Sequence, residues 1–165
     1  MKFKDIPYER VQYENVEKRY LELIEEFKAA TDGPACMEVI RKRNRLTADM
    51  TPMDICYLRH DMDVNDKFFA AEQAYYDEIG PKLADLSGQF DRLMLTSPYR
   101  DYLENVIGHQ AFAMMESAQQ AYNSELIELC QEENNLLSRH NHIFSTMTVD
   151  WNGSKVKSFA YDAGD

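Results

Sequence analysis

Several features that would mark a secreted or membrane protein are scarce in this sequence. No apolar run approaches the ~20 residues that a membrane-spanning helix needs. The opening MKFKDIPYER lacks the apolar stretch of a signal peptide. The three cysteines, Cys36, Cys56 and Cys130, are odd in number and scattered among apolar neighbours, which is typical of reduced thiols in a core. These absences predict a cytoplasmic protein without a membrane partner.

Positive charge is also in short supply. The chain has 18 Lys and Arg against 29 Asp and Glu, which gives a formal net charge of −11. A surface this acidic repels phosphates, so we expect no nucleic-acid partner. The one basic cluster, residues 41–45 (RKRNR), would wrap around a helix and remain solvated or flank the core. With 165 residues and 44% hydrophobic content, the chain suits one domain with its own core.

Motifs for catalysis or metal binding are missing too. There is no Gly-rich phosphate loop, no Cys-x-x-Cys pair and no His-Glu-x-x-His zinc motif. Residues 61–72 have the ligand spacing of a calcium-binding loop, but Asp66 stands where that loop needs glycine, so we expect helix caps there instead. His140 and His142 suit a helix end better than the alternative, a surface metal pair. The sequence predicts no catalytic residue, metal or cofactor in this chain.

What the sequence does contain is the periodicity of amphipathic helices. A first helix from about residue 15 places an apolar face at residues 16, 20, 23, 24 and 27. Dipeptides ending in proline, at residues 33–34, 51–52, 80–81 and 97–98, mark further helix boundaries. Residues 123–125 are expected to cap the last helix. We predict a mainly α protein, an antiparallel bundle of about six to seven helices over residues 1–142.

After His142 the pattern changes to the two-residue period of strands. Asn152-Gly153 is the strongest signal for a two-residue hairpin turn. Folding at this turn predicts three cross-strand pairs, namely Asp150 with Lys155, Val149 with Val156, and Phe144 with Tyr161. We therefore expect residues 143–165 to form a C-terminal β-hairpin.

This hairpin would be marginal alone, because two strands leave open edges and an uncovered apolar face. The expected face consists of Ile143, Met147, Val149 and Trp151. Two consequences follow. We expect the hairpin to lead into a further domain of a larger protein, and we expect self-association as a homodimer through residues 143–161.

One pair of charged side chains is predicted on the inner faces of two helices. A helix from Asn65 places Phe68, Glu72, Tyr75 and Ile79 on one face. In the helix before it, Ile55, Arg59 and Met62 line up. A buried carboxylate needs a partner. We therefore expect a structural ion pair between Arg59 and Glu72, joining the third and fourth helices.

Four segments, in order, resemble the N-terminal helical region of oligoendopeptidase F, a zinc metallopeptidase of the thimet oligopeptidase group. They are MKFKDIPYER, RHDMDVNDKFFAAEQAYYDEIGPKL, SPYRDYLE, and NSELIELCQEENNLLSRH followed by a strand and an Asn-Gly turn. The resemblance extends from Met1 to about Gly153.

The resemblance implies that residues 1–142 form one wall of a deep channel that admits short peptides. The hairpin would lead into a catalytic domain that carries the zinc ligands and lies beyond Asp165, so this chain alone would not be an enzyme. Arg59, Asp63, Phe68 and Glu72 match framework positions of the family. The implied partners are the catalytic domain and, in the parent protein, short peptides. The alternative is a free-standing helical interaction module that retains the fold without the enzyme.

Overall fold

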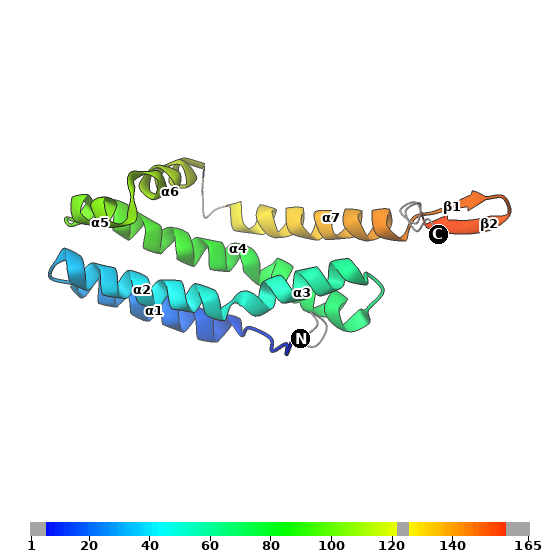
Figure 1. Ribbon diagram of the computed structural model, residues 1–165, viewed down its shortest axis with the longest axis horizontal. Coiled ribbons are helices and arrows are strands. Elements are labelled where there is room, and N and C mark those ends of the chain that lie inside the picture. Colours follow the sequence, from blue (N-terminus) through cyan, green and yellow to red (C-terminus); the bar gives the residue numbers. More distant parts are fainter. Residues whose placement is uncertain (1–5, 122–125, 158–165) are drawn as a thin grey trace.

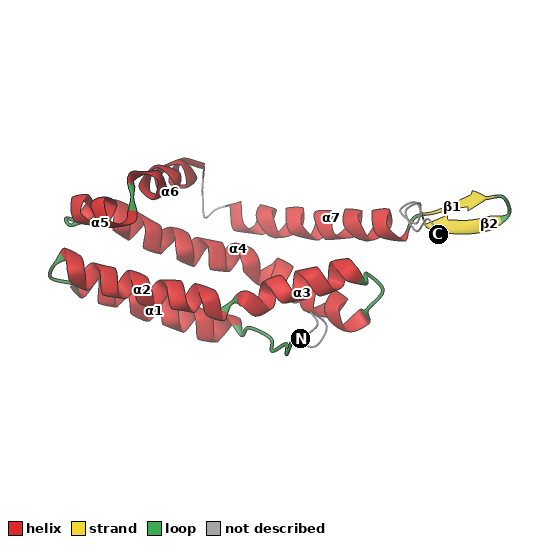
Figure 2. Cartoon of the chain, viewed as in Figure 1, coloured by secondary structure: helices red, strands yellow, loops and turns green. Residues whose placement is uncertain are grey.

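The computed structural model describes residues 6–121 and 126–157 of the chain. The described part is mainly helical and ends in a two-stranded antiparallel hairpin, which confirms the predicted fold class (Figures 1 and 2). The elements are α1 (Tyr13–Ala29), α2 (Gly33–Asp49), α3 (Thr51–Met62), α4 (Lys67–Leu95), α5 (Arg100–Ile107), α6 (His109–Ala121), α7 (Ile127–Thr146), β1 (Thr148–Trp151) and β2 (Ser154–Lys157). The predicted cap at residues 123–125 lies outside the described residues.

Helix α4 is the longest helix and the centre of the bundle. It packs against α1, α3, α5, α6 and α7, and α1 packs in turn against α2 (Figure 1). The largest fully buried side chains are Tyr20, Tyr76, Phe90, Phe112, Leu46 and Leu103, which come from five different helices. The core therefore joins α1 to α6 into one unit.

The first two helices begin and bury residues as the sequence predicts. The apolar stripe expected for α1 is buried at all five positions, 16, 20, 23, 24 and 27. At the start of α2 the Asp32 carboxylate accepts a hydrogen bond from the Ala35 amide at 2.7 Å, and Pro34 occupies the first turn. Both features are typical of helix N-termini, because they satisfy or remove amides that have no partner in the helix.

Helix α4 runs without interruption through Gly80-Pro81, where the sequence predicted a helix boundary. Pro81 lacks the amide that would bond to the preceding turn, which normally favours a break. Here Ile79, Pro81 and Leu83 are all buried. Burial on both sides of the proline compensates for the lost hydrogen bond, so the helix continues.

The hairpin forms at the predicted turn. Asn152 and Gly153 both have positive φ, 50° and 80°, as a tight two-residue turn requires. The register pairs Asp150 with Lys155 and Val149 with Val156, as predicted. Helix α7 continues to Thr146, however, so Phe144 is helical and the strand begins at Thr148 rather than at residue 143. The expected partner of Phe144, Tyr161, lies outside the described residues.

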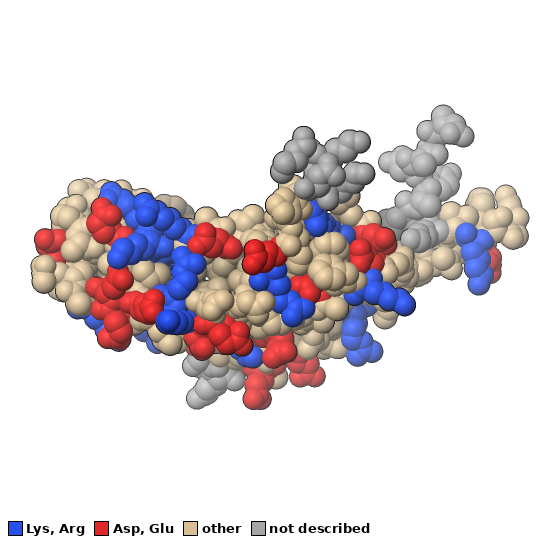
Figure 3. Space-filling view, turned by 90° about the horizontal axis from the view of Figure 1, so that it is seen from below, with Lys and Arg blue, Asp and Glu red and all other residues tan. Residues whose placement is uncertain are grey.

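On the face drawn in Figure 3, Lys and Arg side chains are interspersed with Asp and Glu side chains. Two side chains of the basic cluster have acidic partners on other helices. Lys42 pairs with Glu26 across α1 and α2 at 2.5 Å. Arg43 is largely buried and reaches Asp91 on α4 at 2.9 Å. Two side chains of the cluster therefore link α2 to neighbouring helices, while Arg41 pairs with Glu38 on α2 itself. Within residues 6–121 and 126–157, no helix is long and apolar enough to cross a membrane.

Candidate functional site

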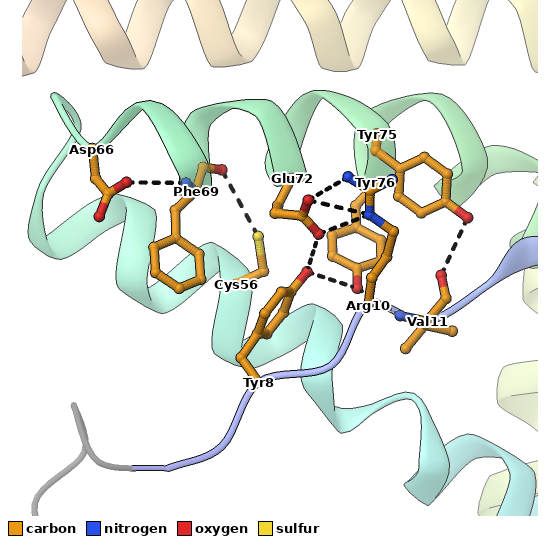
Figure 4. A network of polar contacts seen from close by, with 9 residues as sticks. All are labelled: Tyr8, Arg10, Val11, Cys56, Asp66, Phe69, Glu72, Tyr75 and Tyr76. Carbon is orange, nitrogen blue, oxygen red and sulfur yellow. Dashed lines mark hydrogen bonds and ion pairs between the residues drawn. The ribbon is translucent and has the colours of Figure 1, made fainter.

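A buried carboxylate lies where α4 meets the segment before α1 (Figure 4). Glu72 is only 4% exposed. The Arg10 guanidinium donates to both of its oxygens, with Nε at 3.1 Å from Oε1 and 2.9 Å from Oε2. The Tyr8 hydroxyl donates to Oε2 at 2.5 Å. The hydrogen bonds from Arg10, opposed by burial and helped by Tyr8, lower the pKa of Glu72 below its ordinary value.

Two tyrosines of α4 extend this cluster along the same segment. The Tyr76 hydroxyl lies 3.1 Å from that of Tyr8 and accepts a hydrogen bond from the Val11 amide at 3.0 Å. The Tyr75 hydroxyl donates to the Val11 carbonyl at 3.2 Å, and its ring lies beneath the Arg10 guanidinium at 4.7 Å. Through these hydrogen bonds, Glu72, Tyr75 and Tyr76 of α4 hold residues 8–11 of the extended N-terminal segment in place. The cluster is therefore a structural clamp.

The predicted ion pair has the right carboxylate and the wrong cation. Glu72 is buried as expected, but its guanidinium partner is Arg10 and not Arg59. Arg59 instead donates to the Ile6 carbonyl and lies over the Phe69 ring at 5.3 Å. Helical periodicity indicates only which helix faces meet, and Arg10 lies outside the helices, in the extended segment before α1. The available signal was the alternation of Tyr8 and Arg10, which places both side chains on one side of an extended chain.

Residues 61–72, which have the spacing of a calcium-binding loop, instead supply hydrogen bonds that cap the start of α4 and the Glu72 carboxylate of the clamp. Asp66 is the N-cap of α4, with its carboxylate accepting from the Phe68 amide at 2.8 Å and the Phe69 amide at 3.3 Å. Asp63 accepts from the Asn65 amide at 3.1 Å. Among the described residues, no group of three or more His, Cys, Asp or Glu side chains is placed to hold a metal ion.

A cavity of about 560 Å³ lies between α3, α4 and α7. Its polar lining residues are His60, Gln73, Asp77, Asn135, Ser138, Arg139 and His142. The buried Asp77 carboxylate accepts from the Ser138 hydroxyl at 2.5 Å, and Gln73 donates to that hydroxyl at 3.2 Å. Burial raises the pKa of Asp77, against the opposing hydrogen bonds from Ser138 and Tyr57. A serine that donates directly to a carboxylate ties α7 to α4 and is not arranged as an activated nucleophile.

The fold and its polar clusters define a helical framework domain, and comparison with known proteins gives its family. Residues 3–122 match the family model for the peptidase M3 N-terminal domain. The chain belongs to this family. No curated protein matches the chain.

Solved structures agree with this family over nearly the whole chain. Pz peptidase A with an inhibitor is 30% identical with a TM-score of 0.91, and the match covers 94% of this chain and 28% of that one. A 3.1 Å structure described as oligoendopeptidase F is 29% identical with a TM-score of 0.91, covering 95% and 28%. One described as oligoendopeptidase F from Bacillus anthracis str. Ames is 29% identical with a TM-score of 0.90, covering 95% and 29%. The predicted resemblance is confirmed, and the chain spans less than a third of these relatives.

Proposed function

We propose that this chain is the N-terminal, non-catalytic region of an oligoendopeptidase F-like zinc metallopeptidase that hydrolyses short peptides, and that it forms one wall of the substrate channel. One observation carries the proposal: 94–95% of the chain matches a region that makes up only 28–29% of peptidase chains. The sequence contains no His-Glu-x-x-His motif. Zinc and its ligands would therefore belong to the rest of the parent protein.

The hairpin is the surface that we assign to the catalytic domain. In Figure 1 β1 and β2 extend beyond the helices at one end of the molecule. Val149 is 50% exposed and Trp151 is 65% exposed. A two-stranded hairpin with exposed apolar side chains gains stability when another surface covers it. The catalytic domain would supply that surface and fix the wall relative to the zinc.

A free-standing interaction module is the second candidate function. The observation that favours it is the outer face of α7, where Leu129, Leu136 and Leu137 are each more than half exposed. Such a face suits a protein partner without requiring any catalytic domain. The two candidates differ in one respect: only the first requires the chain to support peptide hydrolysis when it is joined to a catalytic region.

A chimera tests the proposed function. The chain would replace the matching region of the Bacillus anthracis relative, whose backbone it follows with a TM-score of 0.90. We expect the chimera to cleave a fluorogenic short peptide in a chelator-sensitive reaction, whereas the same relative without any N-terminal region should lose that activity. A folded chimera that binds zinc but cleaves no peptide, beside an active unmodified relative, would contradict the proposal.

A further inference from the structure

Helix α7 is attached to the rest of the molecule by hydrogen bonds and not by a buried apolar face. It lies along α4 (Figure 1), and none of its described residues is fully buried. Gln131 donates to the Glu78 carbonyl at 2.6 Å, and Ser138 donates to the Asp77 carboxylate at 2.5 Å. Packing of an apolar face normally supplies most of the stability of a helix. Five large apolar side chains of α7 are instead 47–63% exposed, namely Leu129, Leu136, Leu137, Ile143 and Phe144.

The docked position of α7 buries a carboxylate against neutral donors. Asp77 is 6% exposed. Its oxygens accept from two hydroxyl groups, that of Ser138 on α7 at 2.5 Å and that of Tyr57 on α3 at 3.5 Å. The other titratable or charged groups that act on Asp77 or line the same cavity are Cys56 and His60 of α3, and Arg139 and His142 of α7. Burial raises the pKa of Asp77, because the neutral donors and the attraction of His60 replace the lost water only in part.

Two further polar atoms are buried at this contact without a partner. Among the described residues, neither His60 Nδ1 nor Gln73 Oε1 has a hydrogen bond. The Gln73 amide faces Ser138 through its nitrogen, because the Ser138 hydrogen is already donated to Asp77. The cavity of about 560 Å³ beside these residues shows that α7 does not fill the space over α3 and α4. Each unpaired buried atom destabilises the docked position.

We propose that α7 opens away from α3 and α4 while the rest of the bundle stays folded, and that protonation of Asp77 favours the docked position. In the open position water reaches the Asp77 carboxylate and the two unpaired atoms, which offsets the lost hydrogen bonds from α7. Because α7 leads directly into β1, opening also moves the hairpin. The inference goes beyond the proposed function and does not rest on it, because it uses only contacts within this chain.

The pH dependence of opening has a defined sign. The pKa of Asp77 is raised in the docked position and returns to its ordinary value when water surrounds the carboxylate. A raised pKa means that the docked position binds the proton more tightly than the open one. Opening is therefore rarest below the ordinary aspartate pKa, and it becomes more frequent as the pH rises through the pKa of the docked position. Release of one proton changes the opening equilibrium by up to about tenfold per pH unit in this window.

Hydrogen exchange of the intact chain, followed by mass spectrometry between about pH 4 and pH 7, tests the proposal. Protection factors remove the pH dependence of the chemical exchange itself. We expect peptides from α7 to be less protected than those from α1, and to lose protection with rising pH by up to about tenfold per unit. Asp77→Asn should remove this slope. The matched control is Asp91→Asn, because Asp91 is a part-buried aspartate of α4 that pairs with Arg43 of α2, and the α7 slope should stay unchanged.

A pair of serine variants tests the contact between α7 and α4. Ser138→Ala removes the hydrogen bond to Asp77 and should lower the protection of α7 by roughly tenfold, without changing that of α1. Ser145→Ala is the matched control on the same helix, because the Ser145 hydroxyl donates to the Asn141 carbonyl of α7 itself at 2.7 Å. It should leave the protection of α7 within about twofold of wild type.

Three results would overturn the proposal. The first is equal protection of α7 and α1 at every pH, which would mean that α7 opens only when the whole chain unfolds. The second is a pH slope in α7 that persists in Asp77→Asn. The third is an equal effect of Ser138→Ala and Ser145→Ala, which would mean that the contact with Asp77 does not hold α7 in place.

Discussion

Replacing Arg10 by methionine tests whether the buried Glu72 carboxylate depends on this one cation. The Glu72 side chain is 5% exposed and that of Arg10 is 42% exposed. Removing one partner of a fully buried ion pair costs ~3–5 kcal/mol. Because Arg10 is partly exposed, water can replace part of its contribution, and the hydrogen bond from Tyr8 remains. We therefore expect the free energy of unfolding to fall by about 2 kcal/mol, measured by urea denaturation at neutral pH.

A double-mutant cycle assigns this loss to the pair. Glu72→Leu in the Arg10→Met background should recover much of the stability, since no charge is then left buried. The matched control is Arg19→Met, whose partner Asp49 is 58% exposed; its cost should stay below ~0.5 kcal/mol. A second cycle between Arg59 and Glu72 should show little coupling. Two results would contradict the assignment. One is a free energy of unfolding for Arg10→Met within ~0.5 kcal/mol of wild type, and the other is stronger coupling of Glu72 to Arg59 than to Arg10.

Four further predictions concern the rest of the chain. Burial raises the pKa of Asp77, so its contribution to stability is complete below the ordinary aspartate pKa and is lost as the pH rises through the folded-state pKa. Asp77→Asn should remove this fall from urea unfolding measured across that window, and an unchanged profile would count against the assignment. Gly80→Ala should stabilise the chain by roughly 0.5–1 kcal/mol, because the glycine lies in a helix with open space around it. Gly33→Ala should destabilise it by roughly 1–3 kcal/mol, because the added carbon would overlap the Tyr102 ring; thermal unfolding of the two variants should shift in opposite directions. The purified chain should show no zinc-dependent hydrolysis of a fluorogenic peptide, and activity that a chelator abolishes and zinc restores would contradict this.

Features that depend on a few neighbouring residues could be predicted from the sequence. The stripe of α1, the Asp32-Gly-Pro start of α2 and the Asn152-Gly153 turn each follow from local backbone chemistry, and each is present in the structure. Burial of Glu72 was also predictable, because it lies on an apolar face of one helix.

Features that depend on what covers a surface could not be predicted in this way. The helix boundary expected at Pro81 is absent, because burial of the residues around the proline outweighs one lost hydrogen bond. Phe68 shares the stripe of Glu72, but it lies in the first turn of α4 and is 55% exposed. The apolar face of α7 is present as its periodicity indicates, and it points outward. Periodicity shows that a face exists and does not show what it packs against.

The measurement that tests the central claim most directly is the dependence of kcat/KM on peptide length in the chimera with the Bacillus anthracis relative. If this chain forms a channel wall, the chimera should cleave short peptides and should not cleave a long unfolded protein. The unmodified relative should show the same length limit. As a control, Lys18→Ala in the chimera should leave that length limit unchanged, because the Lys18 side chain lies on the surface of α1 and is 77% exposed. A folded, active chimera that cleaves long and short substrates equally well, beside a relative that discriminates between them, would contradict the claim.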